Sequence, residues 1–340
     1  MLRIVFRFSV ILGLLLPTRA DAQPHLVSKN GSAMGTEVRI SVFTEDDEGA
    51  NRAMDEAFEE IQRIESLMTT WHDSEVFRVN TSAGIEPVKV SDETLDVVEM
   101  AERISKLSDG AFDVTYYGMR GLWKFDEDLE AKLPDPAEVK RRLKLINYRD
   151  LVIDRAHHTL FLKRKGMAMN LGGIAKGYAV DRATAILKRA GYGNAIVQAG
   201  GDLMCSGSKG GAPWGAGIRD PRGGRSDVFA MLRLIDHAFS TAGDYERFFI
   251  LKGKRYHHII DPKTGYPATK SRSVTLYAPT ALLADALDDA VFILGWKRGF
   301  ELIDQIDEVG AVVVDAENRV HVSKRIKDKV DLLKNPSPGI

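Results

Sequence analysis

The chain has 340 residues, of which 44% are hydrophobic and 28% are charged, and its formal net charge is -1. This composition is typical of a soluble globular protein with a substantial core, and the balanced charge argues against a general nucleic-acid-binding protein, which would carry a basic excess. The single cysteine, Cys205, excludes an internal disulfide.

The first 22 residues have the layout of a cleavable secretory signal. Two arginines precede an apolar run at 8–16, and Ala20-Asp21-Ala22 then supplies small residues at alternate positions. The apolar run is too short to span a bilayer as a helix. We therefore exclude residues 1–22 from the fold and expect an exported, soluble protein of the periplasm. An uncleaved membrane anchor is the alternative.

Hydrophobic periodicity predicts the elements that follow. Residues 37–43 alternate as a half-buried strand does, and apolar residues between Met54 and Met68 recur with helical spacing. Ser91 is a good N-cap for a second helix, which ends by Gly110. Further strands are predicted near 150–154, 194–199, 214–218, 228–234, 256–261, 271–278 and 310–315, and further helices near 174–190, 280–294 and 297–305.

The order of these elements indicates the fold class. Strands and helices are mixed without the regular alternation of a doubly wound sheet, so we predict an α+β fold with mixed sheets and flanking helices. One domain is expected over residues 23–334. The proline-containing residues 335–340 are expected to form a flexible tail.

The segment Asn170–Asp181, with the sequence NLGGIAKGYAVD, carries the clearest chemical signal. Its paired glycines precede a predicted helix on which Lys176 and Asp181 lie. Glycines let the backbone approach a ligand closely, and the free N–H groups at a helix start attract anions. The residues therefore indicate a site for an anion such as phosphate, with a simple tight turn as the alternative.

A second signal is a row of acidic residues in the predicted helix 280–294. Asp285, Asp288 and Asp289 are spaced i, i+3 and i+4, which places their carboxylates on one helical face. Oxygen ligands suit Mg²⁺, which commonly binds one or two carboxylates together with substrate phosphates. The spacing alone leaves a metal site and an exposed acidic face equally open.

Several ordered blocks resemble the ApbE family of flavin transferases, which move FMN from FAD onto a protein. The blocks are Ala33-Met34-Gly35-Thr36, Phe112-Asp113-Val114-Thr115, Leu171–Gly177, Gly200-Gly201-Asp202, Thr241–Tyr245, His258–Gly265 and Ala284–Leu287. The resemblance implies an ApbE-like α+β fold with the flavin site in a cleft between sub-structures. It also implies Mg²⁺-dependent transfer of FMN from FAD to a threonine hydroxyl of an acceptor protein, with release of AMP.

The resemblance also implies a set of metal ligands. It assigns the metal to Asp285, Asp289 and the backbone carbonyl of Ala175, with Asp288 as a further ligand. The chain departs from the family pattern at three positions, because Asp289 replaces a common threonine, Asn170 an aspartate and Ala242 a serine. An additional carboxylate should still bind Mg²⁺, but it changes the charge beside the substrate phosphates.

Flavin-binding and catalytic residues follow from the same resemblance. Met34 is expected against the flavin ring, where a flexible thioether is suitable, and Trp71 in the same pocket. His258 and Asp285 are the expected catalytic residues, with His258 neutralising phosphate charge or handling the acceptor proton. The other expected FAD contacts are Asp113, Val114, Thr115, Lys176, Asp181 and Ile260, and His258 also belongs to this set. Ordinary core or surface roles remain the alternatives for these residues.

The implied partner is an acceptor protein with a segment similar to Ser/Thr-Gly-Ala-Thr, such as a subunit of a membrane redox complex. Two alternative functions remain open at this point. An FAD pyrophosphatase would use water in place of threonine and yield FMN and AMP with the same metal and phosphate site. A non-catalytic FAD-binding protein gains support from the departures at Asn170, Ala242 and Asp289.

Overall fold

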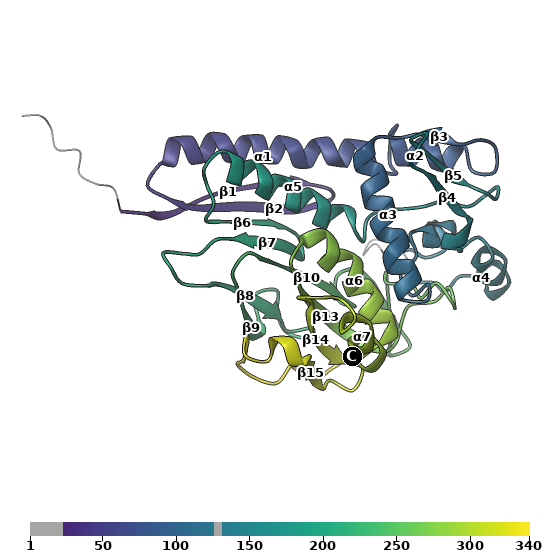
Figure 1. Ribbon diagram of the computed structural model, residues 1–340. Coiled ribbons are helices and arrows are strands. Elements are labelled where there is room, and N and C mark those ends of the chain that lie inside the picture. Colours follow the sequence, from purple (N-terminus) through teal and green to yellow (C-terminus); the bar gives the residue numbers. More distant parts are fainter. Residues whose placement is uncertain (1–22, 126–130) are drawn as a thin grey trace, which may run out of the picture.

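An eight-stranded antiparallel sheet forms the centre of the protein, for which a computed structural model describes residues 23–125 and 131–340 (Figure 1). The expected signal at 1–22 lies outside the described residues. The strand order is β1-β2-β6-β7-β10-β13-β14-β15. The strands are β1 (His25–Ala33), β2 (Thr36–Thr44), β6 (Ala195–Ala199), β7 (Asp202–Ser206), β10 (His237–Gly243), β13 (Ser271–Ala278), β14 (Gly310–Asp315) and β15 (Val320–Val322).

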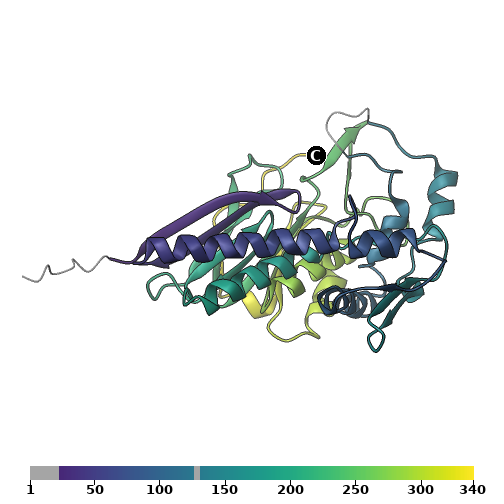
Figure 2. The ribbon, with the colours of Figure 1, turned by 90° about the horizontal axis from the view of Figure 1, so that it is seen from above.

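Helices cover one face of this sheet. Helix α1 (Asp47–Met68) lies along α5 (Ala175–Arg189), which packs on α6 (Ala281–Leu294), and α7 (Trp296–Ile303) follows α6 (Figure 2). Nearly every residue of α6 is buried, which explains why this helix is apolar on almost all sides. Asp285 and Asp288 are therefore buried rather than on a solvated surface.

A three-stranded sheet packs on the opposite face. It has the order β16-β9-β8, formed by β16 (Val330–Leu332), β9 (Val228–Leu234) and β8 (Trp214–Arg219). Trp214, Phe229 and Leu232 of this sheet form a second core with Leu203 and Phe239 of the large sheet. The short helix η3 (Lys324–Ile326) precedes β16. The large sheet is thus covered on both faces, as layered packing requires.

A smaller, mostly helical part lies at one end of the large sheet (Figure 1). It contains α2 (Glu75–Thr81), α3 (Asp92–Leu107), η1 (Val114–Met119), α4 (Pro136–Leu143), η2 (Tyr148–Asp150) and a sheet of β3 (Val88–Lys89), β5 (Thr159–Leu162) and β4 (Leu151–Asp154). Helix α3 contacts α6, so both parts share one hydrophobic core. A separate hairpin joins β11 (Phe248–Leu251) to β12 (Lys254–His257).

The α+β fold class is confirmed, and most elements lie where periodicity predicts them. The strand expected at 256–261 is an exception, because β12 ends at His257. Pro262 cannot donate a ladder hydrogen bond, and the N–H groups of Thr264 and Gly265 donate to the carbonyl of Asp261 in a tight turn. Residues 258–261 are therefore released from the sheet and turn towards the interior of the protein.

Two further expectations concern the C-terminal tail and the membrane. The backbone N and the Oγ of Ser337 donate to Oδ2 of Asp220 at 3.0 and 2.8 Å. This contact argues against a flexible tail at residues 335–340, which stays a prediction. Within residues 23–125 and 131–340, no helix combines the length and the apolar character needed to cross a bilayer.

Candidate active site

A cavity of about 1930 Å³ opens between the end of the large sheet and the smaller helical part. Segments that are distant in sequence line it together: 34–36, 68–72, 111–114, 170–173, 200–202, 241–243 and 258–260, with side chains from α5 and α6. The cavity is large enough for a dinucleotide and part of a second molecule, since ligand pockets commonly measure a few hundred to about 1,000 Å³.

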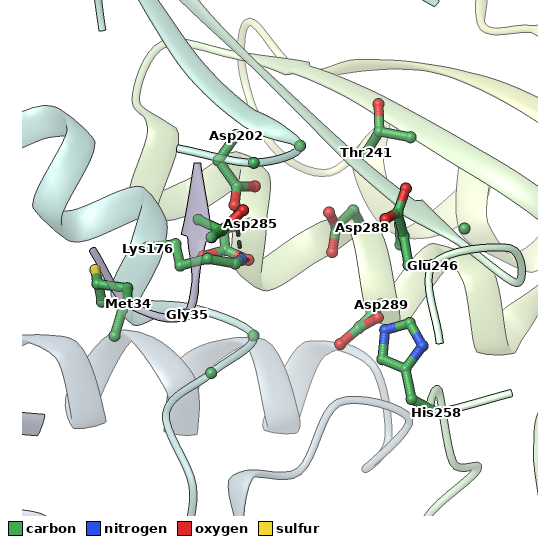
Figure 3. A pocket seen from close by; sticks show the side chains of 18 of the residues that line it. Met34, Gly35, Lys176, Asp202, Thr241, Glu246, His258, Asp285, Asp288 and Asp289 are labelled. Carbon is green, nitrogen blue, oxygen red and sulfur yellow. Dashed lines mark hydrogen bonds and ion pairs between the residues drawn. The ribbon is translucent and has the colours of Figure 1, made fainter. Parts of the chain in front are cut away.

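Most of the expected site residues line this cavity. These are Met34, Trp71, Asp113, Val114, Ala175, Lys176, His258, Ile260, Asp285, Asp288 and Asp289. Figure 3 shows Lys176, Asp285, Asp288, Asp289 and His258 pointing into one space, with Met34 at its side. The structure therefore brings together the two motifs that the sequence indicates, the glycine-lined helix start and the acidic helix face.

Two expected FAD contacts do not line the cavity. The carboxylate of Asp181 accepts hydrogen bonds from the backbone N–H groups of Ala281 and Leu282 at 2.8 and 2.9 Å, so Asp181 caps the start of α6. Thr115 is buried and donates its hydroxyl proton to Asp113. The packing of α5 and the turn at η1 direct these side chains into the protein, so FAD contacts at Asp181 and Thr115 stay predictions that this packing does not favour.

The glycine-rich segment forms the start of α5. Gly172 N donates to the side chain of Asn170 at 2.7 Å, and the side chain of the N-cap residue of α5, Ile174, makes no capping hydrogen bond. A Cβ atom on Gly173 would lie 3.0 Å from Oδ2 of Asp289, so this glycine lets the acidic helix approach the helix start. Within the first turn, the N–H of Gly177 already donates to Asp285 of α6. A helix start favours negative charge, as expected for a phosphate site.

Lys176 lies between two buried carboxylates. Its Nζ is 2.6 Å from Oδ2 of Asp202 and 3.4 Å from Oδ1 of Asp285. The other oxygen of Asp285 accepts a hydrogen bond from Gly177 N at 2.9 Å. Burial opposes the charge on Lys176, but the neighbouring carboxylates outweigh burial and hold its pKa above the usual range. Lys176 is therefore a cation next to the glycine turn.

Asp202 is a site residue that our sequence analysis did not assign. One oxygen each of Asp202, Asp285 and Asp288 lies within 4.8 Å of the others, whereas Asp289 lies outside this group, towards His258 (Figure 3). The expected ligand set thus changes, since Asp202 joins the group and Asp289 stands apart. The sequence signal for Asp202 as a site residue is its position directly after Gly200-Gly201, in one of the blocks that resemble the ApbE family.

These acids could hold a divalent cation. Burial raises the pKa of Asp285, Asp288 and Asp289, and the mutual repulsion of the carboxylates raises it further for Asp285 and Asp288. Lys176 neutralises one charge, and a divalent cation among the three converging oxygens would neutralise two more. Carboxylate oxygens are the donors that Mg²⁺ prefers, so donor type and charge both fit.

Adjacent histidines have different surroundings. His257 is buried, and its Nε2 lies 2.8 Å from the carbonyl oxygen of Ala268, which indicates a structural role. His258 lines the cavity, with Nδ1 3.4 Å from the carbonyl oxygen of Arg247. Burial lowers the pKa of His258, and the nearby His257 and Arg247 lower it further. The imidazole is therefore neutral at physiological pH and able to accept a proton.

Met34 and Trp71 both line the cavity. Met34 has φ 53° and Gly35 φ 70° in the turn between β1 and β2, a conformation that strains a methionine. Trp71 is 85% exposed, which excludes the alternative of an ordinary buried tryptophan. An exposed indole and a thioether that line one cavity provide surface for a flat aromatic ligand.

Comparison with known proteins agrees with this geometry. The model of the ApbE family matches residues 34–313. A curated relative, the FAD:protein FMN transferase of Treponema pallidum, is 33% identical over 317 residues, which span 88% of this chain and 87% of the relative. The crystal structure of the ApbE protein of Thermotoga maritima has a TM-score of 0.81 and 34% identity, covering 90% of this chain and 99% of that one. The flavin transferase ApbE from Vibrio cholerae has a TM-score of 0.78 and 28% identity, with the same coverage. The predicted resemblance is thus confirmed, and the chain belongs to the ApbE family, with the fold of its flavin transferases.

Proposed function

We propose that this chain, a flavin transferase by family, moves FMN from FAD to a threonine hydroxyl of an acceptor protein in a Mg²⁺-dependent reaction that releases AMP. The observation that carries the proposal is the meeting of Lys176 and the buried acids with the glycine-lined start of α5 in one cavity. A diphosphate needs positive charge and N–H donors on one side and a bridging cation on the other, and this cavity offers both.

The diphosphate of FAD would lie between the start of α5 and the acidic face of α6. Lys176 and the N–H of Gly173 in the glycine turn would hold its oxygens, and Gly173 also lets α6 come close. Asp285 and either Asp289 or the pair Asp202 and Asp288 would hold Mg²⁺, and the resemblance adds the carbonyl of Ala175. When bound, Mg²⁺ supplies charge neutralisation for the phosphates and for the departing oxygen.

His258 would accept the proton of the attacking hydroxyl. In the transfer, a bond forms between the threonine Oγ and the FMN phosphorus while the bond from that phosphorus to the bridging oxygen breaks. AMP leaves with the bridging oxygen, and the hydroxyl proton passes to the neutral imidazole of His258. The half-buried position of His258 at the cavity wall supports this role, since an acceptor segment must reach the same place.

The flavin ring would bind between Met34 and Trp71, with Val114 and Ile260 as further apolar contacts. Asp113 supports this surface rather than binding a ligand, because Oδ1 accepts from Thr115 N at 2.8 Å and Oδ2 from Tyr148 N at 2.8 Å. The carboxylate therefore fixes the turn that presents Val114 to the cavity.

The test is incubation of the protein with FAD, Mg²⁺ and an acceptor protein that carries a Ser/Thr-Gly-Ala-Thr segment, followed by mass spectrometry. We expect one FMN on the threonine and one AMP in solution, and loss of both products when a chelator removes the metal. An acceptor with Ala in place of the threonine is the control. Equal release of FMN and AMP with and without acceptor would instead establish an FAD pyrophosphatase. Binding of FAD without any product would establish a carrier.

The site of action is also part of the proposal. An exported enzyme would meet acceptors such as subunits of membrane redox complexes that face the periplasm. The sequence of the signal at residues 1–22 supports export. N-terminal sequencing of the protein recovered from the periplasmic fraction tests this, and we expect a new terminus near Gln23.

A further inference from the structure

Ser240 lies directly beneath the acidic site and contacts two of its carboxylates. Its Oγ is 2.5 Å from Oδ2 of Asp288 and also makes a short hydrogen bond with Oδ1 of Asp202. Ser240 is fully buried and does not line the cavity, so it touches the acids from the protein side. One hydroxyl therefore joins the aspartate that starts β7 to an aspartate of α6.

The position of this hydroxyl is set by the large sheet. Strand β10 is an interior strand, paired with β7 at Phe239 and with β13 at Ser240 and its neighbours. A side chain on an interior strand has little freedom to move, because both neighbouring ladders hold its backbone. Ser240 thus presents its Oγ at a fixed point between β7 and α6.

This contact occupies one oxygen of each carboxylate. Oδ1 of Asp202 faces Ser240, while Oδ2 lies 2.6 Å from Nζ of Lys176. The hydroxyl has one proton and can donate to one carboxylate at a time. Without it, Asp202 and Asp288 would be two buried acids with no shared donor, and their repulsion would separate them.

We propose that Ser240 is a positioning residue for the cation site, holding Asp202 and Asp288 so that one oxygen of each converges with Asp285 on one ion. The inference rests on the proposed Mg²⁺ dependence and extends it to a residue outside the cavity. Partners that hold metal ligands from behind commonly change metal affinity by about 10–100-fold when they are removed. We expect an effect at the lower end of that range, because Asp285 keeps its own hydrogen bond from Gly177.

The experiment compares Ser240→Ala and Ser240→Thr with a matched control, Ser271→Ala. Ser271 is also buried, lies on the neighbouring strand β13 and donates to the carbonyl oxygen of Phe292 in α6 at 3.1 Å, but it does not contact the acids. Mn²⁺ serves as the probe, and its affinity for the protein without FAD is measured by electron paramagnetic resonance. We expect Ser240→Ala to weaken Mn²⁺ binding about tenfold, with Ser240→Thr and Ser271→Ala close to the unchanged protein.

Several outcomes would overturn the inference. Unchanged Mn²⁺ affinity in Ser240→Ala would do so, as would an equal loss in Ser240→Ala and Ser271→Ala, which would indicate a general packing effect. If Ser240→Ala does not fold, Ser240→Cys replaces it, since a thiol keeps the volume but is a weak donor, and it should also lose affinity. Failure of FMN transfer in the unchanged protein, with Mn²⁺ affinity still dependent on Ser240, would refute the proposed reaction and support the positioning role.

Discussion

Helices α5 and α6 cap each other through two aspartates. The two aspartates differ in how many of their carboxylate oxygens accept backbone hydrogen bonds. Asp181 of α5 accepts two backbone N–H groups from the first turn of α6, one at each oxygen. Asp285 of α6 accepts one backbone N–H, from Gly177 of α5, and its second oxygen faces Lys176 and the cavity. The same residue type in nearly reciprocal positions is thus structural at one end and available for binding at the other.

The difference shows how to distinguish a buried acid that serves the fold from one that serves chemistry. A carboxylate whose oxygens are both occupied by backbone donors has no capacity left for a ligand. A carboxylate with one free oxygen beside other charges carries an electrostatic cost that a bound cation relieves.

The largest effect is expected for Asp285→Asn. Its amide oxygen can still accept the N–H of Gly177, so the fold should persist, but the charge available to the cation is lost. We expect FMN transfer to fall on the order of 10³-fold, which corresponds to about 4 kcal/mol of transition-state stabilisation. Rates at saturating FAD and metal measure this. Asp181→Asn is the comparison variant, and an equal rate loss there in a folded protein would break the distinction.

Gly177→Ala is expected to disrupt the contact itself. A Cβ atom at this position would lie 2.2 Å from the backbone oxygen of Ala281, and a backbone atom cannot give way as a flexible side chain can. Separation of the helices should lower the free energy of unfolding by about 3 kcal/mol. Urea denaturation measures it. Gly193→Ala is the control, because a Cβ atom there meets no atom within 4 Å, and similar losses in both variants would contradict this account.

A pH effect of intermediate size is expected from Asp181. Burial raises the pKa of Asp181 to about 6 in the folded protein, above the value of 3.8 for an unperturbed group, so the folded state binds the proton more tightly than the unfolded state. The stabilising contribution is therefore present in full below the unfolded pKa and is lost as pH rises through the folded pKa. Between about pH 4 and about pH 7 it should amount to about 2 kcal/mol.

The measurement is the free energy of unfolding at several pH values for the unchanged protein and for Asp181→Asn. Other buried acids titrate in both proteins, so the difference between the two curves isolates Asp181. We expect this difference to vary through the window. Parallel curves would show that Asp181 is not the perturbed group.

The smallest effect is expected for Asp113→Asn. Asp113 lines the cavity, but both of its oxygens already accept backbone hydrogen bonds, from Thr115 and Tyr148, as the oxygens of Asp181 do from α6. We expect a loss of about 1 kcal/mol in the free energy of unfolding. The saturating rate should stay within about threefold of the unchanged protein, which would identify a structural residue. A loss of rate as large as that of Asp285→Asn would show that lining the cavity matters more than hydrogen-bond satisfaction.

Local patterns predicted much of the fold. The helix 280–294 matches α6, because Thr280 accepts a hydrogen bond from Leu283 N as an N-cap and Gly295, at φ 75°, ends the helix. The strand at 271–278 matches β13 in both bounds. Strand 256–261 was wrong in part, since the turn at Pro262 outweighed the local β preference. Short-range geometry suffices where caps and periodicity agree, and fails where a distant turn redirects the chain.

The candidate site was predictable where one helix or one motif holds the residues. The shared face of Asp285, Asp288 and Asp289 follows from helical spacing alone. The placement of Asp181 did not follow, because the rotation of α5 about its axis depends on what it packs against. The motif resemblance could indicate a nucleotide contact but could not show that α6 already occupies both oxygens of Asp181.

By itself, the sequence determined the glycine-lined helix start and the acidic helix face, since each depends on residues close together in the chain. The order of its elements and motif blocks determined the α+β class and the ApbE resemblance. Only the tertiary structure decided that Asp202 joins Asp285 and Asp288, that Asp289 turns towards His258, and that Ser240 lies beneath them. These residues come from β7, β10 and α6, and strand pairing and helix packing alone bring such distant segments to within hydrogen-bonding distance.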